Sequence, residues 1–142
     1  TSLAEFAKGL GLSVGLVTTT AIYDATPAVF AAHATDRGMY SSIAVQMLYS
    51  GFEVLMGGGL KVFSNLTDVA KQLGYTVVTK RSELLALPVQ TNTKILGLFA
   101  DENIPYVIDR QGNIPSLVDM VSKALEVLER NSEGFLLMVV VE

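Results

Sequence analysis

The stretch F-L-L-M-V-V-V, residues 135–141, decides the fold class. Its apolar side chains do not alternate with polar ones, so a strand made from it would be buried on both faces, as the strands of parallel sheets are. Residues 14–17 have the same character. Segments with helical periodicity separate these runs along the chain. This pattern predicts an α/β fold, a three-layer sandwich with a mostly parallel central sheet.

The remaining elements are expected to continue this alternation. Gly74 is expected just after a helix, and Ser82 and either Ser64 or Asn65 are expected as N-caps. The most regular helix opens at Pro115, where apolar residues recur every three or four positions. The predicted strands are 13–19, 53–56, 76–79, 95–99 and 135–141, and the predicted helices are 3–10, 26–34, 42–48, 65–73, 82–85 and 115–128. No domain boundary is evident, so residues 1–142 are treated as a single domain.

Composition excludes several classes of function. The chain has 142 residues, a net charge of −4 and ten Lys and Arg residues spread singly, so it has no clustered basic patch for nucleic acid. No apolar run approaches the 18 to 20 residues or so of a membrane span. Without Cys, and with His33 as the one histidine, the chain alone cannot form a disulfide, a thiolate site or a multi-histidine zinc site. The mean hydropathy of +0.44 is high for an isolated small domain.

Asp24 and Thr26 are the candidate metal ligands. They lie two residues apart at the start of a predicted helix, and hard cations such as Mg²⁺ take carboxylate and hydroxyl oxygens. Both residue types also cap helices for their own sake, so the pattern alone leaves both interpretations open. Arg37 could bind a phosphate through its guanidinium group, or it could simply be solvated. Their spacing along the chain does not prove that Arg37 and Asp24 meet.

Three further features have a structural and a functional interpretation. Residues 57–59, Gly-Gly-Gly, could offer amide groups to an anion, but they lack the residues of a P-loop and the G-x-G-x-x-G spacing, which favours a tight exit from a strand. The threonines at 18–20 fall at the end of a strand, where α/β ligands gather, but β-propensity explains them too. His33 is a lone histidine within an apolar predicted helix, which is typical of a packed histidine.

Five blocks in sequence order resemble alkaline phosphatase. They are V-T-T-T-A-I-Y-D-A-T-P-A-V-F-A-A-H-A-T-D-R (17–37), V-L-M-G-G-G (54–59), L-G-L-F-A (96–100), P-S-L-V-D-M-V-S-K-A-L-E-V-L (115–128) and G-F-L-L-M-V (134–139). The resemblance spans nearly the whole chain. It implies a phosphate monoesterase with a serine nucleophile, two zinc ions and one magnesium ion. By that resemblance Asp24 and Thr26 bind magnesium and Arg37 is the phosphate-binding residue of the catalytic site.

The resemblance also sets out what is missing from these residues. The serine motif is expected upstream of the first block and most zinc ligands downstream of the last, so the chain is expected to be an incomplete alkaline-phosphatase-like domain without turnover of its own. A magnesium-binding glutamate is expected six residues after Gly134, where this sequence has Val140, and Glu142 is the nearest carboxylate.

The same resemblance implies a phosphate monoester as substrate and a periplasmic or secreted location, although the chain carries no targeting signal. Association is expected either into a homo-oligomer or with the missing part of the domain. Two alternatives remain open on sequence grounds. One is a non-catalytic α/β scaffold or interaction domain that has lost the metal site, and the other is a nucleotide-binding domain that uses residues 57–59.

Overall fold

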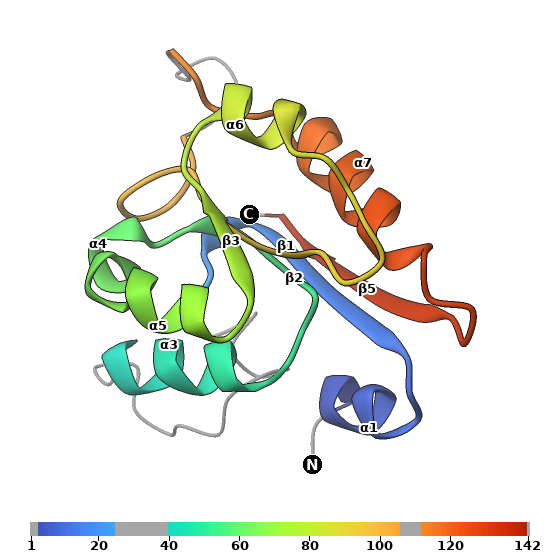
Figure 1. Cartoon of the computed structure of the whole chain (residues 1–142). Helices are drawn as coiled ribbons and strands as arrows, with labels where there is room; N and C mark the ends of the chain where they lie inside the picture. Colours follow the sequence, from blue (N-terminus) through green and yellow to red (C-terminus); the bar gives the residue numbers. More distant parts are fainter. Residues whose placement is uncertain (1–2, 25–39, 106–111, 142) are drawn as a thin grey trace.

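A five-stranded parallel sheet forms the centre of the molecule (Figure 1). The structure is a computed structural model that describes residues 3–24, 40–105 and 112–141. Its strands follow the spatial order β3-β4-β2-β1-β5, and each neighbouring pair is parallel. The strands are β1 (Ser13–Ala21), β2 (Val54–Gly58), β3 (Tyr75–Val78), β4 (Lys94–Leu98) and β5 (Phe135–Val140). The predicted α/β class with a parallel sheet is therefore confirmed.

Helices cover both faces of this sheet (Figure 1). One layer consists of α1 (Leu3–Gly9), α3 (Tyr40–Tyr49), α4 (Leu60–Phe63), the 3-10 turn η1 (Ser64–Leu66) and α5 (Thr67–Gln72). The other layer consists of α6 (Arg81–Ala86) and α7 (Leu117–Leu128). Because successive strand residues point to opposite faces, Leu16 packs into the core under the first layer and Val17 into the core under the second.

The helix boundaries differ from the sequence prediction mainly at the N-caps. The Ser116 side chain accepts a hydrogen bond from the Asp119 backbone N–H at 3.0 Å, so α7 begins just after Pro115 rather than at it. Ser82 lies inside α6, whose cap is Lys80, and two short helical segments, η1 and α5, replace the predicted helix 65–73. The two predicted serine or asparagine caps are therefore wrong. Gly74 follows α5 with φ of 96°, the left-handed geometry that was predicted.

β5 differs from the interior strand that its sequence predicts. Within the described residues it pairs with β1 alone and forms one edge of the sheet. Phe135 is 39% exposed and Val139 43% exposed, and both lie on the same face as Leu137, which packs against the α7 core. The second face is covered better, because Leu136 and Val140 pack against the other core.

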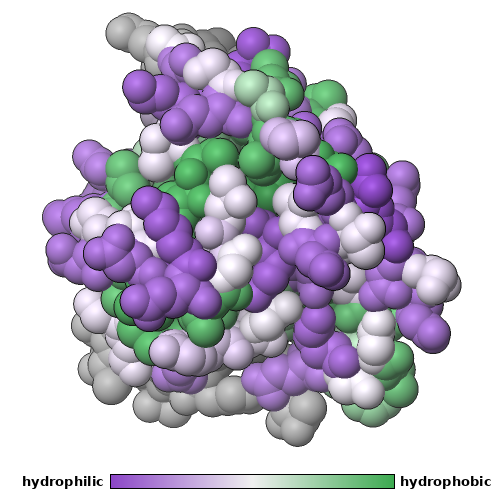
Figure 2. Space-filling model, viewed as in Figure 1, coloured by the Kyte–Doolittle hydropathy of each residue, from purple (hydrophilic) through white to green (hydrophobic). Residues whose placement is uncertain are grey.

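Apolar side chains are also exposed on α1, near the same side of the molecule. The outward face of α1 carries Leu3 and Phe6, and the exposed Leu10 follows the helix, while Ala4 and Ala7 are buried against the sheet. Figure 2 shows apolar surface in this region, at the lower right of the view. The described part of the molecule thus ends at β5 with apolar side chains exposed in two of its layers.

Candidate functional site

Asp24 lies just beyond the carboxyl end of a strand, which is where open α/β sheets bind their ligands. The backbone N–H of Asp24 donates to the carbonyl oxygen of Ala21 at 2.9 Å, which closes a turn directly after β1. The Asp24 side chain is partly exposed. β1, β2, β4 and β5 run parallel, so the residues that follow each of them gather at this carboxyl edge of the sheet.

A bulge separates the regular part of β1 from the Asp24 turn. Val17 pairs with Met56 and Ala21 with Gly58, so β1 advances four residues while β2 advances two. Extra residues of this kind bend a strand and redirect the side chains that follow it. The end of β1 is therefore turned away from the regular ladder just before Asp24.

The threonines of residues 18–20 satisfy the backbone of this bulge. Thr18 Oγ1 accepts from the Thr20 N–H at 3.0 Å and lies 2.8 Å from Thr20 Oγ1, which in turn donates to the Ala21 carbonyl oxygen at 3.1 Å. All of these groups are buried, and a buried polar group without a partner is costly. β-propensity alone is thus an incomplete explanation of the Thr-Thr-Thr sequence.

The glycines of residues 57–59 are needed for close packing at this edge. A Cβ at Gly57 would lie 2.6 Å from the Thr18 side chain, and a Cβ at Gly58 would overlap the carbonyl oxygen of Glu102. The N–H groups of Gly59 and Leu60 both donate to the Ala100 carbonyl oxygen, at 3.0 and 2.9 Å. These two amides are therefore engaged within the chain, which supports the structural interpretation over an anion-binding loop.

Tyr23 packs the Asp24 turn against the helical layer. Its ring lies 4.7 Å from the Tyr40 ring and 6.3 Å from the Phe63 ring, between centroids. Burial raises the pKa of the Tyr23 hydroxyl, and the charge of Glu102 and, more weakly, that of Asp24 raise it further. Glu102 and Asp24 thus place two carboxylates close enough to act on one side chain at the carboxyl edge.

Val140 lies at the same edge, at the end of β5. It pairs with Thr18 in the parallel ladder, and its side chain is partly buried against the core. An isopropyl group has no donor atom for a metal ion. Among the described residues, no three His, Cys, Asp or Glu side chains are grouped closely enough to hold a metal ion.

The other predicted site residues lie outside the described residues. Thr26 and Arg37 fall in residues 25–39, as do His33 and the predicted helix 26–34, and Glu142 is also outside. Their roles remain predictions. Of the three residues assigned to the site from the sequence, the structure places Asp24.

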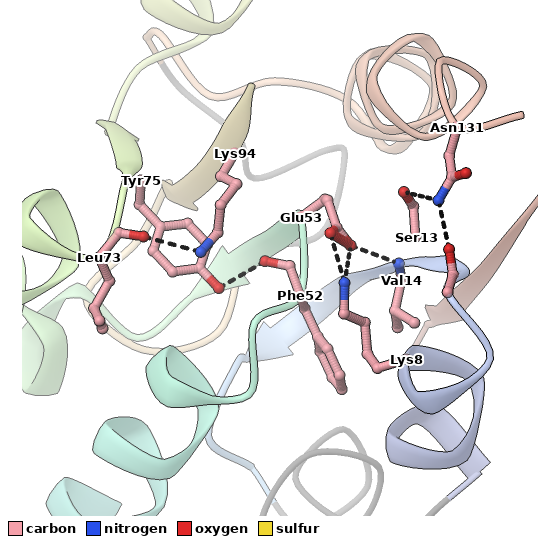
Figure 3. A network of polar contacts seen from close by, with 10 residues as sticks. Lys8, Ser13, Val14, Phe52, Glu53, Leu73, Tyr75, Lys94 and Asn131 are labelled. Carbon is pink, nitrogen blue, oxygen red and sulfur yellow. Dashed lines mark hydrogen bonds and ion pairs between the residues drawn. The ribbon is translucent and has the colours of Figure 1, made fainter. Parts of the chain in front are cut away.

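Sequence reasoning missed a polar network at the opposite, amino edge of the sheet (Figure 3). Lys8 Nζ donates to both carboxylate oxygens of Glu53, at 3.0 and 2.7 Å, and Glu53 also accepts from the Val14 N–H at 2.9 Å. Asn131, just beyond α7, donates to Ser13 Oγ at 3.0 Å. These pairs are 45, 39 and 118 residues apart in the chain, so no local sequence signal could reveal them.

Lys94 and Tyr75 extend the network across the same edge (Figure 3). Lys94 Nζ donates to the Leu73 carbonyl oxygen at 3.0 Å and lies 4.2 Å from the centre of the Tyr75 ring, and burial lowers the pKa of Lys94. The Tyr75 hydroxyl donates to the Phe52 carbonyl oxygen at 2.6 Å, and burial raises the pKa of this hydroxyl. A surface pocket of about 360 Å³ adjoins the network, between Glu53, Lys94 and the end of α7. The polar groups of the network mostly bond to groups of this chain. We therefore interpret the network as one that links the beginnings of the strands to one another.

Comparison with known proteins identifies the relatives of this chain. The family model for alkaline phosphatase matches residues 1–141. Alkaline phosphatase 4 of Bacillus subtilis is 39% identical over 148 residues, which cover 97% of this chain and 32% of that protein. Alkaline phosphatase of Escherichia coli is 30% identical over 191 residues, covering 97% of this chain and 41% of that protein.

Solved structures give the same result. The crystal structure of Thermus thermophilus alkaline phosphatase matches with a TM-score of 0.87 and 40% identity, over 94% of this chain and 30% of that one. A mutant of the alkaline phosphatase from the Antarctic bacterium TAB5, solved with Mg bound in its M3 site, matches with a TM-score of 0.80 and 30% identity, over 99% of this chain and 41% of that one.

The chain spans about a third of the length of the Bacillus relatives and about two fifths of the Escherichia coli enzyme. Within the described residues, no helix is both long and apolar enough to cross a membrane. The family model covers nearly all of the chain, and the relatives and solved structures carry the same name. This chain belongs to the alkaline phosphatase family.

Proposed function

We propose that the carboxyl edge of this sheet forms part of the magnesium- and phosphate-binding site of a phosphate monoesterase. The observation that carries the proposal is the position of Asp24, on a turn fixed at the end of β1 in a chain of the alkaline phosphatase family. Thr26 follows Asp24 by two residues and Arg37 by thirteen, so both belong to the segment that comes next in the sequence.

The donor chemistry fits magnesium with a reduced set of ligands. Asp24 and Thr26 would hold the ion through a carboxylate and a hydroxyl oxygen, the donors that Mg²⁺ prefers, and Val140 would contribute none. The bound ion would supply positive charge that favours a nearby phosphate. Arg37 would bind two phosphate oxygens through paired, charge-assisted hydrogen bonds.

The remaining parts of the activity are assigned to the longer protein. The serine nucleophile and the zinc ligands are proposed to lie outside this chain, whose relatives are about three times as long. A phosphate monoester as substrate, a periplasmic or secreted location, and association with the rest of the domain or with a second copy belong to the same proposal.

Nuclear magnetic resonance of the ¹⁵N-labelled chain tests the proposal. Addition of Mg²⁺ is expected to shift the amide signals of residues 22–24, and Asp24→Asn is expected to abolish that response. Asp68→Asn removes a carboxylate in the first turn of α5, remote from β1, and is expected to keep it. Inorganic phosphate is expected to shift further signals in the wild type but not in Arg37→Ala. Mg²⁺ shifts that persist in Asp24→Asn would contradict the assignment.

A non-catalytic scaffold is the second candidate function, and Val140 is the observation that favours it. An apolar residue at this end of β5 suits a domain that keeps the fold without the metal. Such a scaffold would leave all amide signals unchanged at millimolar Mg²⁺. The two candidates therefore differ in a single titration.

The chain on its own is expected to hydrolyse p-nitrophenyl phosphate no faster than background. Without a positioned nucleophile and paired metals, the developing charge of the transition state is not stabilised. The measurement is the release of p-nitrophenol by the purified 142-residue chain with added zinc and magnesium. Release that needs zinc and stops with a chelator would overturn the division of the site proposed here.

A further inference from the structure

The loop after β4 crosses the carboxyl end of β2 and reaches the end of β1. It is anchored just after β2 by the Gly59 and Leu60 N–H groups, which donate to the Ala100 carbonyl oxygen, and on β2 by the contact between Glu102 and the backbone of Gly58. The Ile104 N–H then donates to the Thr19 carbonyl oxygen at 2.8 Å. Both ends of the loop segment 100–104 are thus fixed to the sheet.

Asn103 is the side chain that this loop places against β1. Its Oδ1 accepts a hydrogen bond from the Ala21 N–H at 3.0 Å, across 82 residues of sequence. The bulge displaces the end of β1 from its regular ladder, and a side-chain acceptor from another segment serves the Ala21 N–H instead. The carbonyl oxygen of Ala21 accepts from the Asp24 N–H at 2.9 Å.

We propose that Asn103 is a positioning residue for Asp24, acting through Ala21. The Ala21 N–H donates to Asn103, and the Ala21 carbonyl oxygen accepts from the Asp24 N–H and closes the Asp24 turn. These two hydrogen bonds link the loop after β4 to the candidate metal ligand. This role rests on the proposed function only in so far as Asp24 is a ligand. The hydrogen-bond link itself can be tested without metal.

This positioning role requires the hydrogen-bond acceptor Oδ1 of Asn103 and not the volume of its side chain. Asn103 is exposed overall, so its replacement removes little packing. Asp retains an oxygen at the same distance from the backbone, whereas Ala removes it and Ser shortens it out of reach. The Asn103→Ala and Asn103→Asp pair therefore separates hydrogen bonding from a general effect of substitution.

Amide hydrogen exchange without metal is the first measurement. In Asn103→Ala the protection of the Ala21 amide is expected to fall about tenfold, the equivalent of one hydrogen bond of typical net strength, and the Asp24 amide signal is expected to shift. Protection at residues 14–17 of β1 should stay at the wild-type level. Asn103→Asp should restore the wild-type pattern, and Asn92→Ala, at an exposed turn by the opposite edge, should leave it unchanged.

Three results would overturn the proposal. They are an unchanged Ala21 amide in Asn103→Ala, a loss of protection spread evenly over β1, β2 and β5, and a failure of Asn103→Asp to restore what Asn103→Ala loses. If Asn103→Ala does not fold, Asn103→Ser removes the same acceptor and is judged by the same criteria.

A Mg²⁺ titration of the same variants separates this proposal from the proposed function. If the wild type responds at residues 22–24, Asn103→Ala is expected to bind Mg²⁺ about tenfold more weakly and Asn103→Asp to bind it like the wild type or better. If the wild type does not respond at all, the metal assignment fails. The exchange measurements then still decide whether Asn103 holds the Asp24 turn.

Discussion

Val140 of β5 pairs with Thr18 of β1 at the edge of the sheet that carries the Asp24 turn. The resemblance to alkaline phosphatase leads one to expect a magnesium-binding glutamate at position 140. Val140→Glu is therefore expected to raise the affinity for Mg²⁺ by about tenfold, because each added carboxylate strengthens a site for a hard cation. Isothermal titration calorimetry measures the change.

The neighbouring residue provides a matched control for that substitution. Val139 lies on the opposite face of β5, so Val139→Glu adds the same charge pointing away from the core that Val140 contacts. An equal rise in both variants would indicate nonspecific attraction. No rise in a folded Val140→Glu variant would mean that the rest of the site is not assembled in this chain.

The start of α7 gives a prediction about pH. Asp119 accepts from Arg81 Nε at 2.8 Å and from the Ser116 N–H at 2.9 Å, and the Arg81 bond, followed by the Ser116 bond, lowers the pKa of the Asp119 carboxyl group. Because that pKa is lower in the folded state, the carboxylate stabilises the fold above its unfolded pKa of about 4. The stabilisation is lost as the pH falls through the native value.

Asp119→Ala is therefore expected to cost about 1 kcal/mol at pH 7, or roughly 3 °C in Tm, because it removes the acceptor of the Ser116 N–H from the capping box and the partner of Arg81. The difference from the wild type should shrink as the pH is lowered below about 4. Thermal unfolding followed by circular dichroism at pH 7 and pH 3 tests both parts. Glu126→Ala, whose side chain is mostly exposed in the last turn of α7, serves as a control with little expected effect.

The order of elements was predictable because it depends on local periodicity. Residues 14–17 read as a buried strand and lie in β1, and the regular apolar face of α7 is buried as expected. Gly74 was predictable because a helix end requires a residue that tolerates positive φ. The family was predictable from five ordered blocks, and the parallel sheet from runs that do not alternate.

The site could be predicted only in part, because its supporting contacts are not local. Asp24 has a recognisable sequence context, but Asn103, which accepts from the Ala21 N–H three residues before it, comes from a loop that crosses the end of β2. An apolar run does not show whether neighbouring strands are present, so the exposed face of β5 could be expected only from the incomplete domain that the resemblance implies. Sequence therefore located the edge of the sheet where ligands gather but not the residues that shape it.

Glu53 combines two roles at the amino edge, and a double-mutant cycle can separate them. Its carboxylate pairs with Lys8 at 2.7 Å and also accepts from the Val14 N–H, and both charged side chains are partly buried. Glu53→Ala is expected to cost about 2 kcal/mol because it leaves a part-buried N–H without its acceptor, whereas Lys8→Ala should cost about 1 kcal/mol or less.

The double variant should cost less than the sum of the two single variants, because the shared ion pair is lost only once. Glu53→Gln keeps an acceptor for Val14 and is expected to behave like Lys8→Ala. Urea unfolding of the four variants measures these free energies. Strict additivity would show that the Lys8–Glu53 pair contributes no coupling.

The open edge of β5 predicts how the chain behaves in solution. An edge strand with exposed apolar side chains is a template for pairing with another strand, and Phe135, Val139 and Val141 are exposed along this one. We expect the 142-residue chain to self-associate through β5 in a concentration-dependent way. Val139→Lys should weaken association, because a charged side chain on an edge strand opposes pairing. Val118→Lys makes the same chemical change on α7, at a residue that is 73% exposed, and should leave association unchanged. Sedimentation equilibrium of the three proteins measures the association constants, and an equal loss in both variants would show that general charge, rather than the β5 edge, controls association.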